Sequence, residues 1–120
     1  MVQRKEYLDK LISWKDEQVI KVVTGIRRCG KSTLLELYRE YLRRSGVSDK
    51  QIVTVNFEDL ENEWLIDYKV LYDYLVKQLC SGEKTYIFLD EVQKVDGFEK
   101  VVDSIYIKKD VDVYITGSNA

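Results

Sequence analysis

Apolar residues along the chain alternate between a spacing typical of helices and short continuous runs typical of buried strands. The helical spacing appears at residues 4–14, 34–42, 71–79 and 98–105. The β-branched or wholly apolar runs lie at residues 19–24, 52–57, 86–89 and 111–116. Strands that alternate with helices indicate βαβ units. The pattern therefore predicts an α/β fold with a mostly parallel sheet and helices on both faces.

Local signals sharpen three of these elements. Gly46 is placed to end the helix of residues 34–42, and Asp67 is placed to cap the helix that follows it. The run 86–89 has no polar residue, as expected for a central strand covered on both faces.

Composition places the chain among soluble globular domains and excludes several site chemistries. Its 120 residues suffice for one domain, and a net charge of −2 gives no overall attraction to nucleic acid or anionic membrane. There is no histidine, and Cys29 and Cys80 show no metal-ligand spacing. The N-terminus is too charged for a signal peptide, and no apolar run is long enough to span a membrane. We expect a cytoplasmic protein.

The stretch GIRRCGKST lies between the first predicted strand and the helix that follows, and it matches G-x-x-x-x-G-K-[ST]. Glycines let backbone N–H groups approach a phosphate, and the helix N-terminus favours the anion. Lys31 would contact the β- and γ-phosphates, and the Ser32 hydroxyl would be a magnesium ligand. The alternative is a glycine-rich turn beside a capped helix. The predicted phosphate-binding residues are Gly25, Ile26, Arg27, Arg28, Cys29, Gly30, Lys31, Ser32 and Thr33.

Two adjacent carboxylates, Asp90 and Glu91, follow the most apolar predicted strand. Ligands bind beyond the carboxyl ends of strands in parallel sheets. Asp90 would hold Mg²⁺ directly or through water, and Glu91, on the opposite side of the strand, would orient or deprotonate the attacking water. An apolar run that ends in two acids is a weak signal alone, and the Gly-Lys-Ser loop strengthens it.

The stretch TGSNA follows the last predicted strand. Either Ser118 or Asn119 would sense the γ-phosphate or place the water, and a simple polar turn is the alternative. Asn56, near the end of the second strand, would hydrogen-bond Glu91 and hold it away from water; this hypothesis rests on position alone.

Three stretches are specific beyond the generic motifs: GIRRCGKSTLLEL, YIFLDEVQKVDGFEKVVDSIYIKKDVDVYITGSNA and RKEYLDKLISW. In these stretches the chain resembles a family of prokaryotic ATPases of the AAA+ superfamily. The resemblance implies ATP and Mg²⁺ as ligands. It also implies that Lys31, Ser32, Asp90 and Glu91 are Walker residues and that Ser118 or Asn119 is the sensor-1 residue. Such P-loop cores have an additional strand and a catalytic glutamate, with the strand order fifth, first, fourth, third, second. The family's biological role is poorly defined, and nucleic acid enters as a partner only by analogy.

The resemblance implies that residues 1–120 are the N-terminal part of the ATPase domain, truncated to about four strands, with the lid and C-terminal domain absent. The strand of residues 19–24 would then lie at a sheet edge, so we expect self-association.

Three functions fit these residues: an ATPase that moves a partner, a nucleotide-binding switch with little turnover, and a P-loop phosphotransferase. Glu91 favours the first. For this chain alone we expect nucleotide binding with little turnover, because no arginine finger is evident in the sequence.

Overall fold

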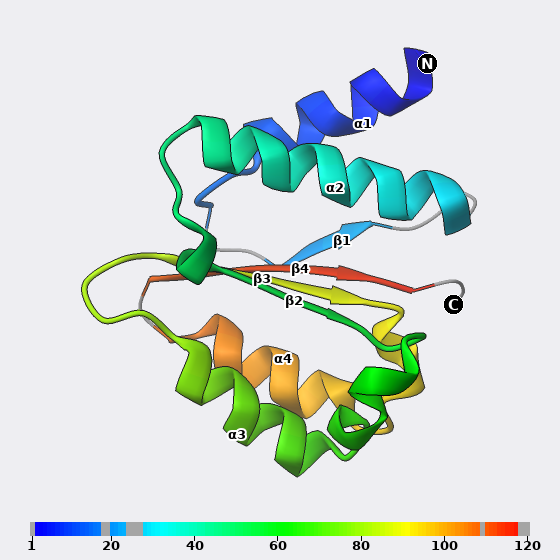
Figure 1. Cartoon of the computed structure of the whole chain (residues 1–120), viewed down its shortest axis with the longest axis vertical. Helices are drawn as coiled ribbons and strands as arrows, with labels where there is room; N and C mark the ends of the chain where they lie inside the picture. Colours follow the sequence, from blue (N-terminus) through cyan, green and yellow to red (C-terminus); the bar gives the residue numbers. More distant parts are fainter. Residues whose placement is uncertain (1, 18–19, 24–27, 109, 118–120) are drawn as a thin grey trace.

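Four parallel strands form one sheet in the computed structural model, which describes residues 2–17, 20–23, 28–108 and 110–117. The strands are β1 (Lys21–Val23), β2 (Ile52–Asn56), β3 (Thr85–Asp90) and β4 (Val111–Thr116). Their order across the sheet is β1-β4-β3-β2, and every neighbouring pair is parallel (Figure 1). The predicted α/β class is confirmed, and this order matches the order implied for the first four strands.

Helices cover both faces of the sheet. α1 (Val2–Ser13) and α2 (Arg28–Arg44) lie on one face, and α3 (Tyr68–Gln78) and α4 (Phe98–Tyr106) lie on the other (Figure 1). Three short 3₁₀ helices, η1 (Asp49–Gln51), η2 (Leu60–Leu65) and η3 (Val92–Lys94), join these elements. The sequence pattern did not predict the 3₁₀ helices, because such short turns carry no repeated apolar spacing.

The sheet separates two apolar cores. Alternate residues of a strand point to opposite faces. Val53, Val55, Ile87 and Leu89 therefore meet α3 and α4, whereas Phe88 and Tyr114 meet α1 and α2. All six residues of β3 are buried, which confirms the predicted central strand.

The ends of two helices agree with the local signals. Gly46 follows α2 with φ 104°, a backbone conformation that glycine adopts readily. The carboxylate of Asp67 accepts hydrogen bonds from the backbone N–H groups of Lys69 and Val70, as an N-cap residue does. Within the described residues, β1 spans three positions of the predicted 19–24 strand, while residues 18, 19 and 24 lie outside the described part.

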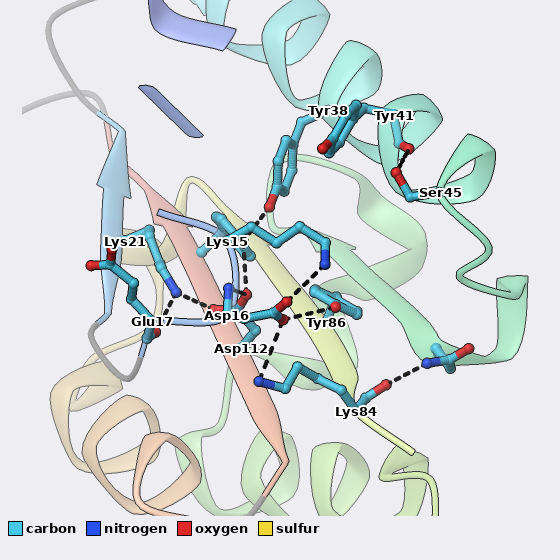
Figure 2. A network of polar contacts seen from close by, with 12 residues as sticks. Lys15, Asp16, Glu17, Lys21, Tyr38, Tyr41, Ser45, Lys84, Tyr86 and Asp112 are labelled. Carbon is cyan, nitrogen blue, oxygen red and sulfur yellow. Dashed lines mark hydrogen bonds and ion pairs between the residues drawn. The ribbon is translucent and has the colours of Figure 1, made fainter. Parts of the chain in front are cut away.

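A buried polar network lies on the α1 and α2 face, near the amino ends of β1 and β4 (Figure 2). Lys21 forms an ion pair with Asp112, and both side chains are almost fully inaccessible to solvent. Lys21 Nζ also donates to the backbone carbonyl of Glu17 at 2.6 Å. The Tyr114 hydroxyl donates to Asp112 Oδ2 at 2.9 Å and shares a hydrogen bond with the Tyr38 hydroxyl. The pair is thus surrounded by partners, as buried charges require.

Hydrogen bonds and ion pairs of the same network join the segment between α1 and β1 to the sheet. The backbone N–H of Asp16 donates to Asp112 Oδ2 at 3.0 Å, and Tyr86 donates its hydroxyl to Asp16 Oδ1 at 2.9 Å. Lys15 and Lys84 form ion pairs with the Asp16 carboxylate. Burial, followed by the hydrogen bond to Asp16, raises the pKa of Tyr86 to about 12.

Candidate nucleotide site

The carboxyl ends of β1, β4 and β3 meet at one edge of the sheet. Val23 of β1 pairs with Thr116 of β4, and Ile115 of β4 pairs with Leu89 of β3. The segments that follow these strands therefore start from neighbouring positions. In an open parallel sheet, this is the edge at which ligands bind.

The predicted phosphate loop connects β1 to α2. Gly25, Ile26 and Arg27 lie outside the described residues. α2 begins at Arg28, so the backbone of Arg28 to Ser32 forms its first turns, and Thr33 is partly buried. The first N–H groups of a helix have no partner within the helix and are available to an anion. The strand–loop–helix arrangement is the one that the motif requires, while the contacts of Lys31 and Ser32 with a nucleotide stay predictions.

Asp90 is the last residue of β3, and its side chain is held by β4. The residue is only 8% exposed, and its Oδ1 accepts a hydrogen bond from the Thr116 hydroxyl. Its backbone carbonyl accepts from the N–H of Phe57 at 3.0 Å. Among the described residues, Asp90 Oδ2 has no hydrogen-bond partner. One carboxylate oxygen is therefore fixed while the other remains for a further ligand.

Glu91 lies just beyond β3 in the left-handed region, with φ 58° and ψ 47°. Its direction is therefore set by this turn and not by strand alternation, which was the basis of the sequence prediction. The residue is 4% exposed, its N–H donates to Thr116 Oγ1 at 3.0 Å, and its Oε1 accepts from Gln93 Nε2 at 2.9 Å. A non-glycine residue in this region costs about 1–3 kcal/mol and persists only where its surroundings hold it.

Two residues of this site were not singled out from the sequence. Thr116 joins the Asp90 carboxylate to the Glu91 backbone, and Gln93 contacts the Glu91 carboxylate. Gln93 Oε1 lies so close to Gly117 that a Cβ atom added there would be 3.0 Å away. The position of Thr116 at the end of a strand was the available signal. Ser118 and Asn119 lie outside the described residues, so their predicted roles remain predictions.

Asn56 uses its side chain locally. Its Oδ1 accepts from the N–H of Glu58 at 3.0 Å, and its backbone carbonyl accepts from Asn62 Nδ2 at 3.0 Å. The residue pairs with Asp90 across the sheet. The described contact to the Glu91 carboxylate comes from Gln93, so the hypothesis that assigned this contact to Asn56 lacks support.

The profile of the family described as "AAA domain" matches residues 17–120. The chain belongs to the AAA domain family. This membership agrees with the parallel sheet and with the loop and acidic residues at its carboxyl edge, and it identifies a nucleotide-binding domain of the ATPase type.

Two curated relatives resemble this AAA domain along almost all of its length. An uncharacterized protein of Haemophilus influenzae is 40% identical over 121 residues, which cover 100% of this chain and 30% of the relative. The uncharacterized protein MJ1637 of Methanocaldococcus jannaschii is 26% identical over 118 residues, which cover 97% of this chain and 24% of the relative. No solved structure matches this chain. The chain thus spans less than a third of each of these relatives.

Three arginines of α2 are ion-paired with glutamates of the same helix. Arg39 pairs with Glu36 at 2.8 Å, and Arg43 and Arg44 pair with Glu40 at 3.5 and 3.6 Å. In the part of the chain that the structure describes, no helix is long and apolar enough to cross a membrane.

Proposed function

We propose that this AAA domain binds ATP with Mg²⁺ and that, within a longer protein, it hydrolyses ATP to act on a partner. One observation carries the proposal: two buried carboxylates lie at the end of β3, joined through Thr116 to the strand that neighbours β1. The segment that follows β1 carries the Gly-Lys-Ser sequence at the start of α2. A phosphate site and an acidic site would then share one edge of the sheet.

The residues present suit a Mg²⁺ ion bound together with a nucleotide better than a metal ion held by protein side chains alone. Within the described residues, no group of three or more His, Cys, Asp or Glu side chains is placed to hold a metal ion. Magnesium in nucleotide sites uses one or two carboxylates and takes its other ligands from phosphates and water. Asp90 would supply a carboxylate oxygen and Ser32 its hydroxyl, and the bound ion would neutralise charge on the phosphates.

The remaining roles follow from chemistry at this edge. Lys31 would contact the β- and γ-phosphates, and backbone N–H groups of the loop and of the first turns of α2, including that of Thr33, would surround them. Glu91 would accept a proton from, or orient, the attacking water, and Ser118 or Asn119 would help to place that water. The hydrogen bond from Gln93 to Glu91 favours a second candidate function, a nucleotide switch that turns over slowly while this bond persists.

Turnover and binding must be measured separately to test the proposal. In the full-length protein, Glu91→Gln should abolish ATP hydrolysis while leaving ATP affinity near that of the parent. Glu99→Gln, which neutralises an exposed carboxylate on α4, is the matched control and should leave both unchanged. Hydrolysis that persists in Glu91→Gln would remove the role assigned to Glu91, and no hydrolysis by the parent protein would remove the ATPase assignment. Loss of binding in Lys31→Ala with turnover absent throughout would support the switch.

Self-association belongs to the same proposal. β1 lies at an edge of the sheet and contributes three paired residues. An open edge of this kind can pair with another copy. Sedimentation over a range of concentrations should show a dimer or larger species, and a monomer at every concentration would exclude it.

A further inference from the structure

The sheet has a second edge, at β2, on the opposite side of the sheet from β1 (Figure 1). The N–H of Phe57 donates to Asp90 on β3, so the backbone groups of residues 53, 55 and 57 point toward β3. Those of Ile52, Thr54 and Asn56 point outward. Two contacts agree with this direction: Ile52 N–H bonds to Asp49 in η1, and the Asn56 carbonyl accepts from Asn62.

Thr54 is at the centre of this outward row. Its side chain is exposed, and within the described residues its backbone N–H and C=O have no hydrogen-bond partner. The Ile52 carbonyl and Asn56 N–H lie on either side of it with the same direction. Because residues alternate along a strand, these groups have the spacing that an added strand requires.

A groove of about 690 Å³ runs beside this edge. The end of α2 and η1 contribute Arg43, Asp49 and Lys50, while α3 contributes Tyr74 and Lys77. β2 itself contributes Ile52, Val53 and Thr54. The groove therefore lies beside residues 52–54, which extend roughly 10 Å at about 3.3 Å per residue.

The charged residues that line the groove indicate which kind of peptide it would bind. Three cations and one carboxylate line it. Arg43 and Asp49 pair with each other at 2.8 Å, and Lys50 lies 3.8 Å from Glu83 at the exposed surface. Lys77 is exposed and has no ion-pair partner among the described residues. Among the described lining residues, Lys77 is thus the cation that remains to attract an acidic side chain.

We propose that the β2 edge binds an extended, acidic peptide segment of a partner protein, which adds a fifth strand beside β2. Thr54 N–H donates to the peptide, the carbonyls of Ile52 and Thr54 accept from it, and Lys77 pairs with a carboxylate of the peptide. This surface lies outside the proposed nucleotide site, so the two proposals fail independently.

The test uses the full chain and a fluorescein-labelled peptide, Glu-Val-Glu-Val-Glu-Val, followed by anisotropy and by amide hydrogen exchange. Peptide binding should protect the amides of Thr54 and Asn56, whereas those of Val53 and Val55 already bond to β3 and should not change. A peptide of alternating lysine and valine tests charge. A Glu-Val peptide with N-methylated amides keeps the charge but cannot form the strand, and it should not bind.

Two variants with matched controls complete the test. Thr54→Pro removes one edge donor and should weaken binding by roughly tenfold, while Thr54→Ala keeps the donor and should bind like the parent. Lys77→Glu should weaken binding by a similar factor, but Lys69→Glu, on the same helix outside the groove, should not.

Four results would overturn the proposal: equal binding of the N-methylated peptide, equal binding of the Lys-Val peptide, no protection of Thr54, or no binding. Protection of Thr54 that rises with protein concentration without peptide would assign the edge to a second copy instead.

Discussion

Thr116 donates its hydroxyl hydrogen to the carboxylate of Asp90, although the two residues are separated by 26 positions and lie on different strands. The same oxygen accepts the N–H of Glu91 at 3.0 Å. One hydroxyl thus orients the proposed metal ligand and supports the turn that carries the proposed base. Local sequence patterns do not predict a polar contact of this kind, because its two residues lie on different strands.

Thr116→Val should destabilise the fold, because it leaves the buried N–H of Glu91 without its partner at a cost of about 1–3 kcal/mol. Thr116→Ser keeps the hydroxyl and is the matched control. Urea unfolding would measure both variants. The Mg²⁺ dependence of nucleotide binding should also weaken more in the valine variant, and equal behaviour of the two variants would contradict this role.

Glu91→Gly should be more stable than Glu91→Ala, by about 1 kcal/mol or more, because glycine adopts φ 58° without strain. Both variants lose the carboxylate, so their difference reports the backbone. The same pair of substitutions at Asp73, an exposed residue in the middle of α3, should have the reverse order by about 1 kcal/mol. Denaturant unfolding of the four proteins tests this, and alanine being favoured at both positions would refute it.

Asp112→Asn should lower the free energy of unfolding by about 3–5 kcal/mol, because it leaves the Lys21 ammonium buried without its counter-ion. Asp103→Asn, on the exposed side of α4, should change stability by less than about 0.5 kcal/mol. Thermal or urea unfolding compares them. Similar small losses in both variants would mean that the buried pair is dispensable.

Alkaline pH should destabilise the protein through its buried tyrosines. The pKa of Tyr86 is raised by burial from 10.0 to about 12, and burial also raises the pKa of Tyr38 and Tyr114. Between pH 10 and 12 the unfolded chain loses these protons while the folded chain keeps them, so stability is complete below pH 10 and falls as pH rises. Urea unfolding at several pH values, with tyrosinate absorbance, measures this. Tyr86→Phe should reduce the loss of stability per pH unit above pH 10, and an unchanged loss would exclude a contribution from Tyr86.

The strands and helices were predictable because each satisfies a local rule. The apolar run before Asp90 is buried throughout, and Asp67 caps α3 where its sequence position suggested. The order of the strands came from the resemblance and not from periodicity, since periodicity does not specify which strands are neighbours.

The site was only partly predictable. Asp90 could be placed at the carboxyl edge because it follows a central strand. The left-handed turn at Glu91 could not, because this backbone state is rare for glutamate and depends on Thr116 across the sheet. Gln93 was missed for a similar reason: its contact with Glu91 depends on that turn.

The short pairing of β1 has a thermodynamic consequence. The strand before the phosphate loop is joined to the sheet by three residue pairs with β4, whereas β3 is paired along both sides. Edge elements of this kind open more readily than the centre of a sheet. A ligand that binds only the closed arrangement raises the cost of opening with its concentration. The exchange rate of the Val23 amide would then serve as a local gauge of nucleotide occupancy, even when no nucleotide is turned over.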